Sequence, residues 1–230
     1  MKIEVLPDAD AVAQRAAEFL ADAARAAVAD RGQFTFAVSG GRTPWQMLRA
    51  LGALAMPWEK TQLFQVDERV APHGDPDRNL THIAESLLSV APLARDHVHA
   101  MPVETPDMTE GAARYARELA AVAGTPPILD VVHLGLGPDG HTASLVPGDP
   151  ALAVADAAVA LTEPYQGHRR MTLTFPVLDR ARHVLWVVTG AEKVPMLARL
   201  VRGDRAIPAG RVAGERALIL ADAAAAAGLR

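Results

Sequence analysis

The chain of 230 residues carries 27 acidic and 23 basic side chains, a formal net charge of −4, and half of its residues are hydrophobic. This near balance argues against nonspecific binding to nucleic acid or to an anionic membrane, which requires a concentrated basic surface, although it allows a local basic pocket for a small anion. The sequence has no cysteine, which excludes disulfides and thiolate chemistry and is typical of a reducing compartment, so we expect a cytoplasmic protein. No stretch reaches the roughly 18 apolar residues of a membrane span, and we therefore expect no membrane partner.

Short β-rich segments alternate with longer helical patterns. The first predicted helix should end near Gly32, and Pro44 suits the first turn of the second. Strands are predicted at 3–6, 34–38, 62–66, 128–135, 171–175, 183–189 and 216–221, and helices at 8–30, from about 43, at 80–89, 109–122 and 191–201. This alternation predicts an α/β fold, a doubly wound, mostly parallel sheet with helices on both faces. No repeat or long linker divides the chain, so we expect a single domain over residues 1–230.

Three polar or glycine-rich loops follow predicted strands, namely Ser39–Pro44, Asp67–Asn79 and Gly135–Leu145. In open α/β sheets, ligands bind outside the carboxyl ends of the strands, at a topological switch point. We therefore expect these three loops to meet in one site.

The first loop, SGGRTP, has the composition of a phosphate site. Gly40 and Gly41 let backbone N–H groups approach a ligand, and the helix that follows points its unpaired N–H groups at the same place. Ser39 and Thr43 add hydroxyl groups, and Arg42 adds positive charge. The segment also fits an ordinary strand-to-helix turn with Thr43 as N-cap. It matches neither G-x-G-x-x-G nor a Walker loop, so it does not predict a dinucleotide or ATP.

The third loop, within LGLGPDGHTASLVPG, places His141 among closely spaced glycines. Glycine permits positive φ and a close approach of the backbone. Such crowding around an imidazole favours a chemical role over a surface turn that His141 merely caps, because loops on a rigid scaffold commonly carry chemistry.

A helix is expected to begin at Thr142 or Ser144, which would put His141 at a strand-to-helix turn. The positive end of that helix would disfavour a protonated imidazole, and a neutral imidazole can accept a proton. Asp139, two residues earlier, can fix the tautomer or share the proton transfer. His141 and Asp139 are therefore the candidate catalytic residues.

Charged side chains occur at three other strand ends. Asp67, Glu68 and Arg69 can contact substrate hydroxyls and phosphate, although the motif taken alone favours an ion pair in an ordinary loop. Arg170 begins a predicted strand and Lys193 follows another, and both matter only if the fold brings them to the same pocket.

The sequence lacks the patterns of several other chemistries. It has no H-E-x-x-H and no carboxylate cluster with zinc or calcium spacing, so no metal is expected. It has no G-x-S-x-G elbow, which argues against a serine hydrolase.

Five segments resemble those of 6-phosphogluconolactonases and occur in the same order: SGGRTP, VDERVAPHGDPDRN, LGLGPDGHTASLVPG, RRMTLTFPVLDRARHV and VTGAEK. The resemblance spans nearly the whole chain, and its most specific part is GPDGHTASLVPG. The chain departs from that family at Arg42, where a small Ser is more frequent, and at Val146, where Phe is usual.

The resemblance implies a fold shared with glucosamine-6-phosphate deaminases and ribose-5-phosphate isomerases. It implies hydrolysis of 6-phospho-D-glucono-1,5-lactone, the second step of the oxidative pentose phosphate pathway, without metal or organic cofactor. His141 resembles the catalytic base. The small-molecule partner would be the sugar-phosphate lactone, bound by residues that we assign as Ser39, Gly40, Gly41, Arg42, Thr43, Asp67, Glu68, Arg69, Asn79, Gly137, Arg170 and Lys193.

Two alternatives remain open from the sequence. A sugar-phosphate deaminase or isomerase on the same fold shares the phosphate loop, but deaminases carry Asn-Glu-Pro after their Gly-His, where this chain reads TASLVPG. A non-catalytic sugar-phosphate sensor would need an attached DNA-binding module, and neither end shows a basic helix-turn-helix segment. We expect a monomer or a weak homo-oligomer.

Overall fold

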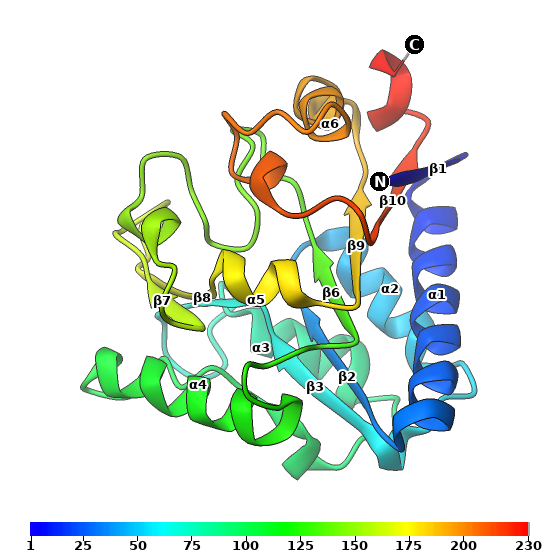
Figure 1. Cartoon of the computed structure of the whole chain (residues 1–230). Coiled ribbons are helices and arrows are strands. Elements are labelled where there is room, and N and C mark those ends of the chain that lie inside the picture. The colour runs from blue at the N-terminus through cyan, green and yellow to red at the C-terminus, as the bar shows by residue number, and fades with distance from the viewer. Residues whose placement is uncertain (230) are drawn as a thin grey trace.

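A seven-stranded sheet forms the centre of the computed structural model, which describes residues 1–229 and leaves the last residue of the predicted domain, Arg230, outside (Figure 1). All of its neighbouring strands run parallel, in the order β1-β10-β9-β6-β2-β3-β5. Their bounds are β1 Lys2–Leu6, β2 Phe34–Val38, β3 Thr61–Gln65, β5 Val98–His99, β6 Val131–Leu134, β9 His183–Val188 and β10 Ala217–Asp222. The predicted parallel α/β sheet is confirmed.

Six α-helices accompany the sheet in the described part of the chain: α1 Ala9–Arg31, α2 Arg42–Gly52, α3 Asn79–Ile83, α4 Met108–Ala123, α5 Phe175–Arg180 and α6 Val194–Val201. A π-helical turn, Ala84–Leu88, continues α3, and 3₁₀ turns lie at Trp58–Lys60, Arg95–His97, Pro150–Ala153, Ala191–Lys193, Ala209–Arg211 and Ala225–Gly228. Helix α1 ends where the sequence predicts. Asp8 caps its start by accepting from the Ala11 N–H at 2.8 Å, and Gly32 ends it with φ of 77°.

Each face of the sheet carries its own hydrophobic core, because successive side chains of a strand point to opposite faces. Phe36 packs in the core beneath α1 and α2, whereas its neighbour Ala37 belongs to the core on the side of α4, α5 and α6. Leu185 and Trp186 of β9 divide in the same way. Figure 1 shows α1 and α2 on one side of the sheet and α4 and α5 on the other. The predicted helices on both faces are therefore confirmed.

A second, three-stranded antiparallel sheet lies beside the main one, in the order β4-β8-β7. It consists of β4 Asp67–Arg69, β7 Val159–Leu161 and β8 Arg170–Leu173. The sequence predicted a loop from Asp67, and this was wrong for its first three residues. A strand of three residues is too short to show a period of two, and it exists only because β8, a hundred residues later, pairs with it.

The expected helix after His141 is absent. Thr142 and Leu145 instead close a tight turn, in which the Leu145 N–H donates to the Thr142 carbonyl at 2.9 Å. Ala143 has φ of 52°, outside the helical region, and Pro147 disfavours helical backbone at the residue before it. No helix N-terminus therefore lies behind His141, and the argument that a helix keeps its imidazole neutral was wrong.

Candidate active site

The site lies at the topological switch point of the main sheet. Neighbouring strands β2 and β6 lead to opposite sides, because the chain leaves β2 toward β3 and leaves β6 toward β9. At their carboxyl ends a pocket of about 250 Å³ opens, lined by Ser39, Gly40, Asp67, Arg69, Asn79, Gly135, Leu136, Gly137, Pro138, His141, Ala143, Gln166, Arg170 and Lys193. The three loops predicted to meet do so here, together with residues of two further segments.

His141 and Asp139 form a hydrogen-bonded pair at this pocket. The His141 Nδ1 lies 2.6 Å from the Asp139 Oδ1, and the same oxygen accepts from the His141 backbone N–H at 3.1 Å. A carboxylate only accepts, so Nδ1 carries the proton and Nε2 of the neutral ring bears the lone pair. Partial burial opposes ionisation of Asp139, but hydrogen bonds and charge from His141, with a hydrogen bond from Tyr165, outweigh it and lower the pKa of this carboxyl. Asp139 is thus the residue that sets the tautomer of His141.

Two glycines of the site are required for steric reasons. A Cβ on Gly137 would overlap the imidazole of His141, and a Cβ on Gly40 would overlap the side-chain amide of Asn79. The glycine-rich sequence around His141 therefore lets the ring lie against the backbone of its own loop.

The first loop is held by a histidine that the sequence analysis did not use. His133, on β6, is fully buried, and its Nδ1 accepts from the Ser39 N–H at 3.3 Å. Burial lowers the pKa of His133 to about 3, so the ring is neutral and can act as an acceptor. The Ser39 hydroxyl is buried at the pocket without a hydrogen-bond partner. It is therefore available to a ligand.

Three predicted binding residues of this loop, Gly41, Arg42 and Thr43, do not line the pocket. Gly41, with φ of 134°, is the N-cap of α2, so Thr43 is not, and Arg42 is exposed in the first turn. The Thr43 hydroxyl bonds the Thr189 hydroxyl at 2.7 Å and ties this loop to the one that carries Lys193. Thr43 therefore joins two loops, and Arg42 does not reach the pocket.

Glu68 holds the second loop and does not line the pocket. It is fully buried, and its carboxylate accepts from the Gln65 amide and from the backbone N–H groups of Arg69, Asn79 and Leu80, each at 2.8 Å. These bonds occupy its acceptor sites. Glu68 is predicted from the sequence to bind substrate, but in the structure its carboxylate instead shapes the loop of the binding residues.

Asp67 and Asn79 of the same loop do reach the pocket. The Asp67 Oδ2 accepts from the Ser144 hydroxyl at 2.7 Å, and the Asn79 Nδ2 donates to the Asp67 carbonyl at 2.9 Å. The Asn79 Oδ1 is buried without a partner. Both side chains thus retain an acceptor for ligand hydroxyl groups.

Two arginines face each other across the small sheet at the pocket. Arg69 and Arg170 are directly paired in the β4–β8 register, and the Nε of each is buried without a partner. Burial and the charge of Arg69 both lower the pKa of Arg170. Like charges at opposite positions of a sheet destabilise it. This pair is therefore suited to bind an anion.

Lys193 adds a third cation to the lining. Its loop begins at Gly190, whose N–H lies 3.1 Å from both carboxylate oxygens of Asp222 at the end of β10. Asp222 and Ser144 were not found from the sequence, since neither belongs to a local pattern.

Residues 162–169, the connection between β7 and β8, also contribute to the site. Tyr165 donates to the Asp139 Oδ2 at 3.1 Å, and Gln166 lines the pocket. Neither residue is predicted from the sequence, although the pair Gln166-Gly167 before a predicted strand is a turn signal. Within residues 1–229, no group of three or more metal-ligating side chains is gathered.

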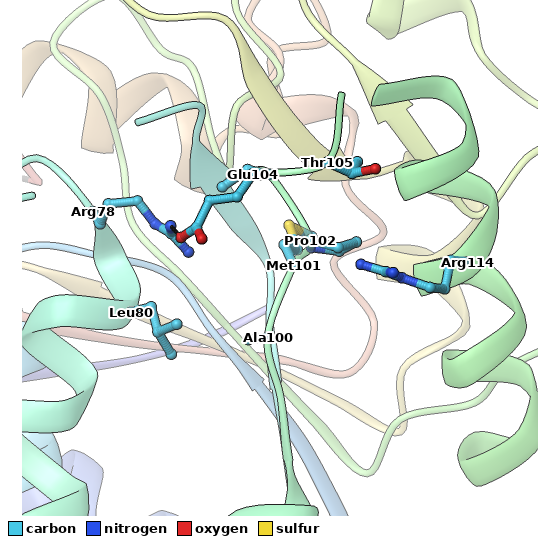
Figure 2. Close-up of a pocket in the computed structure, with 9 residues that line it drawn as sticks. Arg78, Leu80, Ala100, Met101, Pro102, Glu104, Thr105 and Arg114 are labelled. Atoms are coloured by element: carbon cyan, nitrogen blue, oxygen red, sulfur yellow. Dashed lines mark hydrogen bonds and ion pairs between the residues drawn. The ribbon is translucent and has the colours of Figure 1, made fainter. Parts of the chain in front are cut away.

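A larger cavity of about 460 Å³ lies nearby but contains none of the predicted site residues. Arg78 lines this cavity, whereas its neighbour Asn79 lines the pocket. Figure 2 shows Arg78 against Glu104 on one side and Arg114 of α4 on the other. The Arg78 Nε also lies 3.3 Å from the Glu68 carboxylate.

Residues 7–220 match the family model described as glucosamine-6-phosphate isomerases/6-phosphogluconolactonase. The chain belongs to this family. Among its relatives, the 6-phosphogluconolactonase of Synechocystis sp. is 37% identical over 86% of this chain and 84% of its own length. That of Mycobacterium tuberculosis is 36% identical over 99% and 98%, respectively.

Solved structures of family members have the same fold. The 6-phosphogluconolactonase of Thermotoga maritima superposes with a TM-score of 0.86 at 27% identity, covering 96% of this chain and 98% of that one. A monomeric glucosamine-6-phosphate deaminase gives a TM-score of 0.85 at 16% identity, covering 99% and 100%, and this likeness concerns the fold alone. Within the described residues, no helix has the length and hydrophobicity needed to cross a membrane.

Proposed function

We propose that this protein hydrolyses 6-phospho-D-glucono-1,5-lactone to 6-phospho-D-gluconate, the second step of the oxidative pentose phosphate pathway. The observation that carries the proposal is the joint presence, in the lining of one pocket, of His141, which Asp139 holds from behind, and the facing residues Arg69 and Arg170. The first supplies a proton acceptor, and the second supplies a site for phosphate. Relatives more than 30% identical over most of the chain are named 6-phosphogluconolactonase, which supports the same reaction.

His141 acts as general base. Its Nε2 takes a proton from a water molecule as that water attacks C1 of the lactone, while Asp139 keeps the other ring nitrogen protonated. A lactone is an activated ester, so no covalent nucleophile is needed. The tetrahedral intermediate then collapses, the ring oxygen leaves as an alcohol, and His141 returns the proton to it.

Negative charge develops on the carbonyl oxygen during the attack. Gly40 lines the pocket, and its N–H donates to no backbone or side-chain acceptor within residues 1–229. An N–H group fixed in the loop before α2 stabilises such charge without reorganisation.

The phosphate binds between Arg69 and Arg170, with Lys193 completing the positive lining. This interaction takes place at a group remote from the reacting carbon, and it supplies binding energy that orients the substrate. Asp67 and Asn79 accept from the sugar hydroxyls, and Ser39 donates to the ligand.

The test follows proton release from lactone generated in situ, at mildly acidic pH where spontaneous opening is slower. Wild-type protein should accelerate the reaction, and the folded variant His141→Ala should lose about 10²–10⁴-fold of kcat, the usual contribution of general base catalysis. Equal rates for wild type and His141→Ala would show that a residue other than His141 is the general base. No acceleration by the folded wild type would overturn the lactonase assignment.

A sugar-phosphate deaminase is the second candidate, supported by the shared fold alone. Release of ammonia from glucosamine 6-phosphate by the wild type, without lactone hydrolysis, would establish it.

The proposal also includes a single domain, a cytoplasmic location suggested by the absence of cysteine, and a monomer or weak homo-oligomer.

A further inference from the structure

The connection between β7 and β8 ends in a tight two-residue turn beside the pocket. The Tyr165 N–H donates to the His168 carbonyl at 2.9 Å, and the His168 N–H donates to the Tyr165 carbonyl at 3.2 Å. Between them, Gln166 and Gly167 have φ of 50° and 86°, as the central residues of a type I′ turn do. His168 also lies 3.1 Å from the Asp77 carboxylate, which ties this turn to the second loop. Tyr165 therefore stands on a firmly held segment.

Tyr165 contacts both parts of the site. Its hydroxyl donates to the Asp139 Oδ2 at 3.1 Å, and its ring meets the His141 ring edge-on, with centroids 5.5 Å apart. On the other side the Arg170 guanidinium lies 5.1 Å from the centre of the tyrosine ring, and its Nη2 donates to the Tyr165 carbonyl at 3.4 Å. One side chain thus touches the base, the carboxylate behind it and a cation of the phosphate site.

We infer that Tyr165 is a positioning residue, which locks the Asp139 carboxylate in the orientation that fixes the tautomer and plane of His141. This inference rests on the proposed function of the same site. The Oδ1 of Asp139 accepts a hydrogen bond from His141 and its Oδ2 accepts one from Tyr165, so both oxygens are fixed. The Asp139 side chain is one-third exposed, and without Tyr165 nothing else among the described side chains holds its Oδ2. Without the Tyr165 hydroxyl the carboxylate stays beside the ring but is free to rotate, so the orientation of His141 is no longer fixed.

The Tyr165 hydroxyl also lowers the basicity of the Asp139–His141 pair. A hydrogen bond to Oδ2 withdraws charge from the carboxylate and weakens its attraction for a protonated imidazole. The other charged groups that face the pocket, Asp67, Arg69, Arg170 and Lys193, stay in place when only the hydroxyl is removed. Loss of the hydroxyl should therefore keep the imidazolium to higher pH.

The decisive variant is Tyr165→Phe, because it keeps the ring beside Arg170 and removes only the hydroxyl. We expect kcat to fall about 10-fold with KM unchanged, the effect of one hydrogen bond to a charged group. The acidic limb of the kcat/KM profile should move upward. Tyr165→Leu, which also removes the ring, should add an increase in KM.

The matched control is Tyr115→Phe, since Tyr115 is the only other tyrosine and lies buried in the core. Its hydroxyl donates to the Gln65 carbonyl at 3.0 Å and accepts from the Gln65 N–H at 2.8 Å, and it bonds neither Asp139 nor His141. This variant should lower stability and leave the pH profile unchanged. A merely structural role of Tyr165 would give the same pattern, with lower stability and an unmoved profile, and would overturn the inference.

A second measurement separates this inference from the proposed function. The ring of His141 is followed by NMR as pH varies in substrate-free protein, with His141→Ala identifying its resonances. An upward shift in its titration in Tyr165→Phe supports the coupling even if no lactone is hydrolysed, and an unchanged titration overturns it. Absence of lactone hydrolysis by the wild type overturns the proposed function alone.

Discussion

The candidate active-site pocket and the cavity of Figure 2 are both lined by arginines, but these arginines differ in how their charge is balanced. In the cavity, Arg78 is buried and paired with Glu68 and Glu104. In the pocket, Arg69 and Arg170 face each other with unpaired Nε groups. The cavity is the larger of the two, so volume does not identify the site. The feature that distinguishes the pocket is the positive charge of Arg69 and Arg170 beside the proton acceptor His141.

One buried residue, which lines neither region but contacts residues of both, explains the difference. Glu68 neutralises Arg78 on the cavity side, and on the pocket side it accepts from the backbone N–H groups of Arg69 and Asn79. The buried carboxylate thus holds the loop in shape while leaving the side chains of Arg69 and Asn79 to the pocket.

The largest effect is expected from Arg78→Met, which should destabilise the protein by about 3–5 kcal/mol, because it leaves Glu68 as a buried charge without its cation. Chemical denaturation measures this loss. The matched control is Glu104→Gln, in which the lost partner is half exposed, and it should cost less than about 1 kcal/mol. Equal losses in the two variants would show that the Glu68–Arg78 pair does not hold the loop.

Arg170→Gln should raise KM about 30-fold with little change in kcat, since truncating one partner of a charge pair costs roughly 2 kcal/mol or more in binding. Without ligand the variant should be at least as stable as wild type, because the repulsion from Arg69 is gone. Inorganic phosphate should raise the Tm of wild type more than that of the variant. A variant with wild-type KM would remove Arg170 from the phosphate site.

His133 should make stability depend on pH. Its pKa in the folded protein, about 3, lies below the unfolded value of 6.5, so between these values the unfolded chain binds the extra proton. Stability is therefore lost as pH falls below 6.5, by about 2 kcal/mol from this residue at pH 5. Denaturation of wild type and His133→Asn, which keeps an acceptor for Ser39, measures it. Identical pH slopes would contradict the assignment.

The smallest effect is expected from Arg114→Ala, on the far wall of the cavity. Arg114 is exposed, so the change should alter stability by less than about 0.5 kcal/mol and leave KM unchanged. Steady-state kinetics and denaturation check this. An increase in KM comparable with that of Arg170→Gln would show that the cavity, like the pocket, takes part in substrate binding.

Local patterns in the sequence determined the α/β class, most strand positions and the identity of the His141 loop. The alternation of Phe36 and Ala37, or of Leu185 and Trp186, is not visible as a hydrophobic period, because both faces of a central parallel strand are buried. The runs of apolar residues still marked these strands. Glycines near His141 could be predicted to matter, since their spacing is local.

Only the tertiary structure decided which polar residues face the pocket. Glu68 and Asp67 are adjacent in sequence, yet Glu68 holds a loop and Asp67 lines the pocket. The reason is that both lie on strand β4, which pairs with β8, and successive side chains of a strand point to opposite faces. Tyr165 and His133 escaped the sequence analysis for the same reason: their partners, Asp139 and Ser39, lie 26 and 94 positions away. Local periodicity and the chemistry of short motifs can be read directly from a sequence. Hydrogen bonds between distant segments form only after the sheet has brought those segments together.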